Sequence, residues 1–160
     1  SAMEDMLSDT TIDFVGGSII LDGENVDGAI RTPEMSMMAS KVSQLAPVRA
    51  KLVASQRQMA AAKSVIMDGR DIGTNVMPDA EYKFFMTASA EERADRRYKE
   101  LVQKGIDADY DEVLKDIEKR DYEDTHRELD PLKPAEDAII LDTTGIGIDE
   151  VVERILGEVK

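Results

Sequence analysis

Short apolar segments that alternate with long charged helical patterns constrain the fold of this chain more than any other feature. Each segment is bounded by turn residues or by charges, and the three segments cover residues 64–67, 82–87 and 138–141. Alternation of this kind is typical of parallel strands that are joined by crossover helices. The sequence therefore predicts an α/β fold, with a parallel sheet that helices cover on both faces.

Charged residues follow the first of these segments without a break. The stretch VIMDGRDIGT places Asp68, Arg70 and Asp71 directly after the apolar run. A structural salt bridge is one interpretation, but α/β proteins bind ligands at the carboxyl ends of their strands. We therefore favour a ligand site. In that site Asp68 could hold a Mg²⁺-bound water, Arg70 a phosphate and Asp71 the donor edge of a base.

Two charge-rich helices are predicted between the second and third segments. The first begins at a capping box formed by Ser89 and Glu92, and Gly105 ends it. The second begins near Asp109, with Glu112 as its reciprocal capping partner.

Three arginines of the first helix, Arg93, Arg96 and Arg97, follow the spacing i, i+3 and i+4 and can project from one face. The ordinary interpretation is a solvated face on which they pair with neighbouring acids. The alternative is a movable cationic arm that closes on nucleotide phosphates.

The second helix places Arg120, Asp124 and Arg127 at i, i+4 and i+7, again on one face. They could form an intrahelical ion-pair ladder of little energetic weight. They could equally grip a sugar phosphate, because arginine offers forked donors to phosphate and aspartate accepts from ribose hydroxyls. His126, the one histidine, is interpreted as an exposed helix residue.

The N-terminal part is predicted to contain small antiparallel strands within residues 12–30. Gly16-Gly17 and Asp22-Gly23 supply the tight turns between them. Further helices are predicted over residues 32–42, 48–63 and 149–159.

Composition excludes several classes of function. A net charge of −14 argues against a nucleic-acid polymer as partner, because phosphate backbones require a basic face. The absence of cysteine removes disulfides, thiolate nucleophiles and Cys-based zinc sites, and it fits a cytoplasmic location. No apolar run approaches the length of a membrane-spanning helix, so no membrane partner is expected.

Four segments together resemble the bacterial cytidylate kinases, which are P-loop nucleoside monophosphate kinases of pyrimidine metabolism. The resemblance covers nearly the whole chain. It implies an enzyme that transfers the γ-phosphoryl group of ATP, with Mg²⁺, to CMP or dCMP, and an intact family member that is monomeric. The matching segments are ILDGENVDGAIRTPEMS, VIMDGRDIGTNVMPDAEYKFFMTASAEERADRRYKEL, KRDYEDTHR and PLKPAEDAIILDTT.

The resemblance also implies roles for individual residues. Cytosine would be recognised by Ser40, Arg49 and Asp71. The phosphate of CMP would be held by Arg70 and Arg127, and the ribose and neighbouring oxygens by Arg120 and Asp124. Asp68 would support the magnesium shell through water, without any direct protein ligand to the metal, and Arg93, Arg96 and Arg97 would belong to a lid over ATP.

The chain departs from the family pattern because no GxxxxGK[ST] loop occurs in it. That loop cradles ATP phosphates, so we expect this chain alone to be inactive in phosphoryl transfer. The resemblance also implies that the first, central strand of the parallel sheet is missing, which predicts self-association through unpaired strand edges. The alternative interpretation is a non-catalytic CMP-binding fragment or degenerate homologue.

The predicted organisation has three parts. Residues 1–3 are interpreted as the scar of a cleaved expression tag, and residues 4–63 as a monophosphate-binding region that carries the small antiparallel insert. Residues 64–160 are expected to form the core sheet, with a lid at about residues 89–127.

Overall fold

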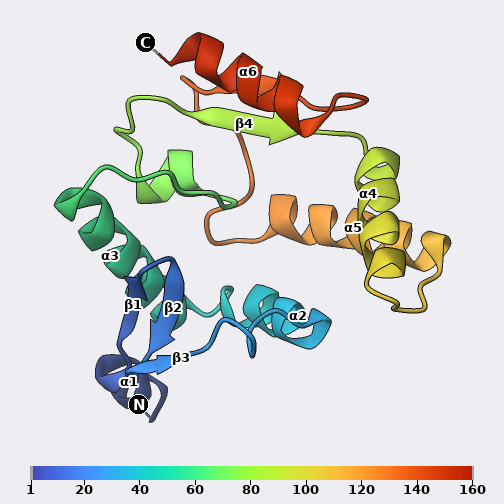
Figure 1. The fold of residues 1–160 in the computed structure, drawn as a ribbon. Helices are drawn as coiled ribbons and strands as arrows, with labels where there is room; N and C mark the ends of the chain where they lie inside the picture. The colour runs from blue at the N-terminus through green and yellow to red at the C-terminus, as the bar shows by residue number, and fades with distance from the viewer. Residues whose placement is uncertain (1, 160) are drawn as a thin grey trace. The chain divides into compact units, whose positions relative to one another are not determined.

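The computed structural model describes residues 2–159, apart from the side chain of Pro33. The chain forms two compact units, of which the first ends at Ile66 and the second begins at Met67. Figure 1 shows their elements.

The first unit begins with α1 (Ala2–Asp9) and a three-stranded antiparallel sheet. Its strands are β1 (Ile12–Val15), β2 (Ser18–Leu21) and β3 (Glu24–Asn25). Gly16 and Gly17 have φ angles of 60° and 87° between β1 and β2, as a two-residue hairpin turn with right-handed strand twist requires. The predicted small antiparallel strands with tight turns are confirmed.

Two helices complete the first unit. Thr32 caps α2 (Pro33–Val42), and its hydroxyl oxygen accepts from the backbone N–H of Met35 at 3.1 Å. The second helix, α3 (Ala46–Ala62), packs against α1. Both helices lie close to the bounds that the sequence predicts.

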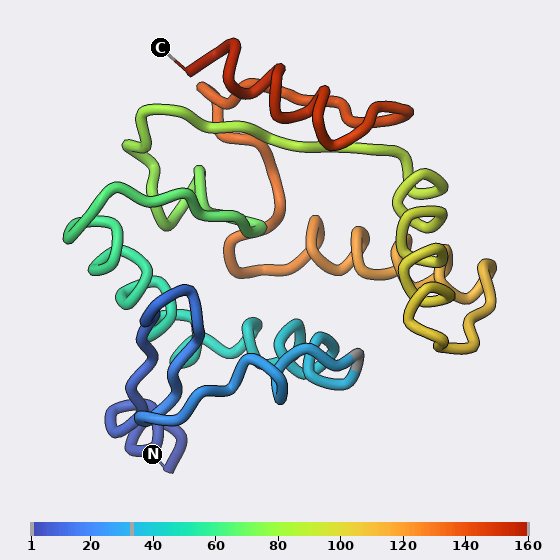
Figure 2. The backbone as a smooth tube through the Cα atoms, viewed as in Figure 1, coloured from blue at the N-terminus to red at the C-terminus, as the bar shows by residue number. Residues whose placement is uncertain are grey.

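The second unit contains a parallel pair of strands, β4 (Phe84–Thr87) and β5 (Ile139–Asp142). Their register places Phe84 opposite Ile139 and Thr87 opposite Asp142. Between them run α4 (Ala90–Gln103) and α5 (Tyr110–His126), which pack against each other, and α6 (Ile148–Glu158) follows β5. Figure 2 shows the chain returning from α5 to β5. An α/β fold with a parallel sheet is therefore confirmed.

Local chemistry explains where α4 and α5 begin. The hydroxyl oxygen of Ser89 accepts from Glu92 N–H at 3.1 Å, and the carboxylate of Asp109 accepts from Glu112 N–H at 3.0 Å. The predicted reciprocal bond of the Ser89 box is wrong. Ser89 N–H instead donates to Thr144 Oγ1, just after β5, at 3.2 Å, and the Glu92 side chain accepts from Arg96.

The strand predicted at residues 64–67 is wrong. A strand persists only where a neighbouring backbone supplies ladder hydrogen bonds, and within the described residues β4 and β5 pair with each other and with no third strand. Residues 64–67 remain irregular, and Ile66 is fully exposed. Downstream, residues Ile72–Val76 form a π-helical turn.

Few apolar side chains of the second unit are buried. Val76, Ala94 and Leu141 are less than a tenth exposed, whereas Met86 on β4 and Ile140 on β5 are each more than half exposed. The strand pair therefore leaves apolar surface uncovered. Within residues 2–159, no helix is long and apolar enough to cross a bilayer.

Candidate functional site

The turn after residue 68 positions Asp71. Its backbone carbonyl accepts from the N–H groups of Asn75 and Val76, at 2.9 and 3.2 Å, which closes the π-helical turn. Val76 is 3% exposed and anchors this turn in the unit. A Cβ atom at Gly69 would meet Ile72 Cγ1 at 2.9 Å, so a larger residue at that position would require the Ile72 side chain to move.

Three arginines surround the buried carboxylate of Asp124. Arg70 Nε donates to Asp124 Oδ2 at 2.7 Å. Arg120 Nε lies 3.9 Å from Oδ2, and Arg127 Nη1 lies 3.9 Å from Oδ1. Three guanidinium groups thus approach one carboxylate, in a chain whose net charge is −14. Such an excess of forked donors favours a phosphate or carboxylate ligand.

One donor atom of Arg127 has no hydrogen-bond acceptor among the described residues. Its side chain is 10% exposed, and its Nε donates to the backbone carbonyl of Asp130 at 2.8 Å. Its Nη2 is buried, and none of the described residues offers it an acceptor. A buried cationic donor without an acceptor is costly, so this atom favours an anionic partner from outside the chain.

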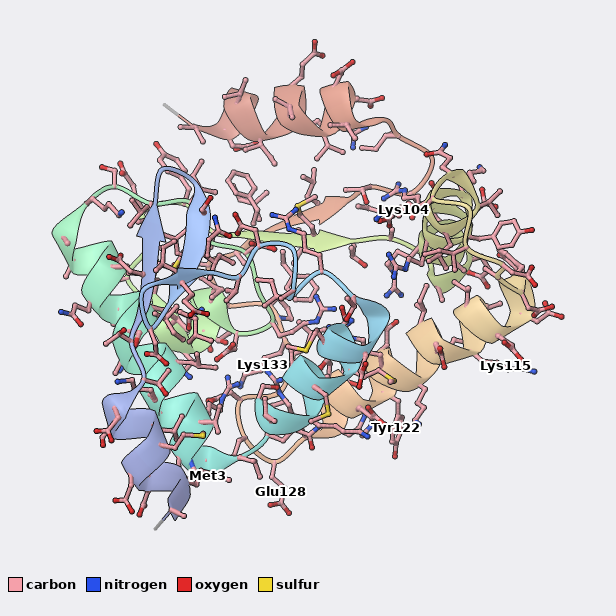
Figure 3. All side chains as sticks on the ribbon, turned by 60° about the horizontal axis from the view of Figure 1, so that its bottom comes forward. Met3, Lys104, Lys115, Tyr122, Glu128 and Lys133 are labelled. Atoms are coloured by element: carbon pink, nitrogen blue, oxygen red, sulfur yellow. The ribbon has the colours of Figure 1, made fainter. Side chains whose placement is uncertain are left out.

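The exposed side of α5 carries a pair of stacked aromatic rings. Figure 3 shows Lys115 and Tyr122 projecting outward from this helix. Tyr122 is 64% exposed and stacks on His126, with ring centroids 4.0 Å apart. The predicted exposed position of His126 is confirmed.

Asn75 links Asp71 to the segment that follows α5. Its Nδ2 donates to Asp71 Oδ2 at 3.1 Å and to Asp130 Oδ2 at 3.0 Å. The NH₂ group must face these two carboxylates, because carboxylates accept hydrogen bonds and the amide oxygen cannot donate one. Asp71 is 9% exposed.

The arginines of α4 donate to separate acceptors. Arg93 makes a forked pair with Asp121 on α5, at 2.8 and 2.5 Å, and this hydrogen-bonded carboxylate raises the pKa of Arg93. Arg96 Nη2 donates to the backbone carbonyl of Thr143 at 2.6 Å. Arg97 pairs with Glu100 on its own helix at 2.9 Å. Their guanidinium groups do not meet on one acceptor, and their role in a lid stays a prediction.

Three predicted site residues remain, one in the second unit and two in the first. Asp68 is exposed at the start of the turn. Ser40 lies on α2 and Arg49 on α3, both in the first unit, and their role in recognising cytosine stays a prediction. No group of three or more His, Asp or Glu side chains among residues 2–159 is arranged to hold a metal ion.

Sequence reasoning missed four residues of this region. Asn75 and Asp130 join Asp71 to Arg127, while Asp121 and Thr143 hold arginines of α4. Asp121 has a recognisable signal, since it lies beside Arg120 in a run of alternating charges. The others carry none, because a polar residue in a turn or at a strand end is ordinary.

A parallel α/β unit whose surplus guanidinium groups surround one buried acid indicates a nucleoside monophosphate kinase, a class of transferase. The sequence model described as Cytidylate kinase matches residues 1–160. The chain is 55% identical over 150 residues to a cytidylate kinase of Clostridium perfringens (strain SM101 / Type A). The aligned region covers 94% of this chain and 69% of that protein.

Two further relatives agree. The cytidylate kinase of Caldicellulosiruptor bescii is 53% identical over 151 residues, covering 93% of this chain and 67% of its own length. That of Thermosipho melanesiensis is 48% identical over 158 residues, covering 99% and 73%. The chain belongs to the cytidylate kinase family.

Proposed function

We propose that the arginine cluster around Asp124 binds the phosphate and ribose of CMP or dCMP, as the acceptor site of an ATP-dependent cytidylate kinase. The observation that carries this proposal is the approach of three guanidinium groups to one buried carboxylate, together with Arg127 Nη2, which has no acceptor among the described residues. A nucleoside monophosphate supplies the missing negative charge and has hydroxyls for Asp124.

The two ends of the cluster suit different parts of the ligand. Arg70 and Arg127 would bind phosphate oxygens, because their guanidinium donors lie beside the two oxygens of the same Asp124 carboxylate. Arg120, half exposed, and Asp124 would contact the ribose and neighbouring oxygens. Held in this way, the acceptor phosphate is oriented for in-line attack, which is the main contribution a protein makes to phosphoryl transfer.

Asp71 would select the base. A carboxylate accepts from the exocyclic amino group of cytosine, whereas uracil presents a carbonyl oxygen at the same place. The π-helical turn holds Asp71 nearly buried, so a mismatched base would leave a desolvated charge facing an acceptor. Preference for cytosine over uracil therefore follows from the position of one acid.

Fewer residues support the proposed binding of ATP and Mg²⁺. Asp68 offers a hard carboxylate oxygen, and Mg²⁺ in kinases is commonly held by one or two carboxylates and the substrate phosphates. The exposed Asp68 fits that use through a bound water, and Mg²⁺ would then neutralise charge on the transferring group. No GxxxxGK[ST] loop occurs among these 160 residues. We propose that Arg93, Arg96 and Arg97 would exchange their present partners for phosphate oxygens of ATP.

Non-catalytic CMP binding by this chain is the second candidate, because three arginines lie around Asp124 while the sequence contains no GxxxxGK[ST] loop. Calorimetry with CMP, UMP, AMP and ATP, together with an ADP-release assay, tests both. CMP-selective binding with ADP release supports the kinase, and CMP-selective binding without it supports the second candidate. Failure to bind any of the four would contradict both.

We also infer that copies of this chain associate. The support is the short parallel pair β4–β5 with its exposed Met86 and Ile140. Sedimentation analysis should show oligomers that a Met86→Lys and Ile140→Lys double variant reduces to monomer. A monomeric parent chain would contradict this inference.

A further inference from the structure

We infer that Asn75 and Asp130 form a brace that positions the base-reading Asp71 relative to the phosphate-binding Arg127, and so determines base selectivity. This inference rests on the proposed function, because it assumes that Asp71 and Arg127 contact the same nucleotide. Neither Asn75 nor Asp130 needs to touch the ligand, so both are positioning residues.

The first half of the brace fixes the orientation of the Asp71 carboxylate. Asn75 holds Asp71 twice, through its backbone N–H to the Asp71 carbonyl at 2.9 Å and through Nδ2 to Oδ2 at 3.1 Å. The carboxylate therefore cannot rotate about its Cβ–Cγ bond without breaking a hydrogen bond. An acid that must accept from one amino group in the plane of a base depends on such a fixed orientation.

The second half ties this turn to the phosphate end of the site. The same Nδ2 of Asn75 donates to Asp130 Oδ2 at 3.0 Å. Asp130 then accepts from Arg127 Nε through its backbone carbonyl at 2.8 Å. Asp130 thus contacts both ends with two different groups, and it lies 55 positions from Asn75 along the chain.

The backbone of Asp130 shows that this arrangement is held in place. Its φ angle is 47°, a left-handed conformation that side chains other than Asn and Asp rarely adopt. Nearby, Leu132 N–H donates to the Asp124 carbonyl at 2.7 Å, which fixes the segment on the end of α5.

The φ angle supplies a matched pair of substitutions. Asp130→Gly accepts the left-handed backbone without strain and removes the carboxylate, whereas Asp130→Asn keeps an acceptor for Asn75 and tolerates the same φ. Asn75→Leu removes the bridging NH₂ at similar size. Asn25→Leu in the antiparallel sheet, where the side chain accepts from Asp27 N–H at 3.0 Å, is the control.

The test measures dissociation constants of the 160-residue chain for CMP and UMP by calorimetry. We expect Asn75→Leu and Asp130→Gly each to lower the preference for CMP over UMP about fivefold, while Asp130→Asn and Asn25→Leu preserve it. If Asn75 and Asp130 had only a structural role, their substitution would weaken the binding of CMP and of UMP equally. An unchanged ratio in both Asn75→Leu and Asp130→Gly, in a parent chain that prefers CMP, would overturn the brace and leave the proposed function standing. A parent chain that binds no CMP would overturn the proposed function and the brace with it.

Discussion

Arg70 Nε donates to Asp124 Oδ2 at 2.7 Å, although the two residues are 54 positions apart in the sequence. This bond joins the turn after residue 68 to the last turn of α5. It brings the third arginine to a carboxylate that Arg120 and Arg127 already flank. Tertiary structure thus adds to the positive character of the site, which contrasts with the acidic composition of the chain.

Replacing Arg127 should weaken CMP binding strongly. Arg127→Gln removes a charged donor whose Nη2 has no acceptor among the described residues, so we expect the dissociation constant for CMP to rise about 10- to 100-fold. Calorimetry measures this change. Arg154→Gln on α6, where Arg154 pairs with Glu150 at 2.6 Å, is the matched control and should leave the constant unchanged. Equal effects of the two substitutions would contradict a local role for Arg127.

Replacing Asp71 by asparagine should change base selectivity. Asparagine can turn a donor toward the uracil carbonyl, so CMP affinity should fall and UMP affinity should rise. We expect a combined change worth about 1–3 kcal/mol in the CMP-to-UMP ratio. Competition binding with the two nucleotides measures it. Asp79→Asn, an exposed acid in the same region, should leave the ratio as it is. Selectivity that survives Asp71→Asn would show that other residues read the base.

The forked pair between Arg93 and Asp121 should stabilise the packing of α4 on α5. Both side chains are 36% exposed, so solvent screening limits the coupling to about 0.5–1 kcal/mol. A double-mutant cycle with Arg93→Gln and Asp121→Asn, measured by urea unfolding, should show this coupling, and added salt should reduce it. The exposed pair Lys99–Asp95 is the control and should couple less. No coupling between Arg93 and Asp121 would mean that apolar contacts alone hold the two helices.

Asp142, at the end of β5, should make the stability of the fold depend on pH in the acid range. The backbone N–H of Thr144 donates to Asp142 at 2.9 Å, and this hydrogen bond lowers the pKa of Asp142. A carboxylate whose folded pKa is lowered stabilises the fold above its unfolded pKa, near 3.9, and loses that contribution as pH falls below it. Asp142→Asn keeps an acceptor but removes the titration. Urea unfolding between pH 6 and about 2.5 should therefore show a smaller loss of stability in Asp142→Asn, and parallel curves for the two chains would contradict the assignment.

Local chemistry in the sequence predicted much of the fold. Ser89 and Asp109 fix the starts of α4 and α5 through bonds to residues three positions on, which a sequence pattern displays directly. The antiparallel hairpin follows in the same way from Gly16 and Gly17. The strand expected at residues 64–67 failed because a ladder depends on a partner strand, and apolar character alone does not supply one.

The candidate site was predictable only in part. Sequence spacing brings together Arg120 and Asp124 on α5 and Arg127 at its C-cap, whereas the approach of Arg70 to Asp124 depends on tertiary folding. The resemblance to a family supplied that residue. Asn75 and Asp130 had no comparable signal, because their importance lies in a contact across 55 positions.

The surplus of guanidinium groups around Asp124 has a consequence for kinetics. At distance, an incoming dianion meets the repulsive field of a protein whose net charge is −14, and it is attracted only within a few ångströms of the arginines. Dissolved ions screen the long-range repulsion more effectively than the short contacts. The association rate of a nucleotide should therefore increase with ionic strength while the complex becomes shorter-lived, which is the reverse of electrostatically steered capture.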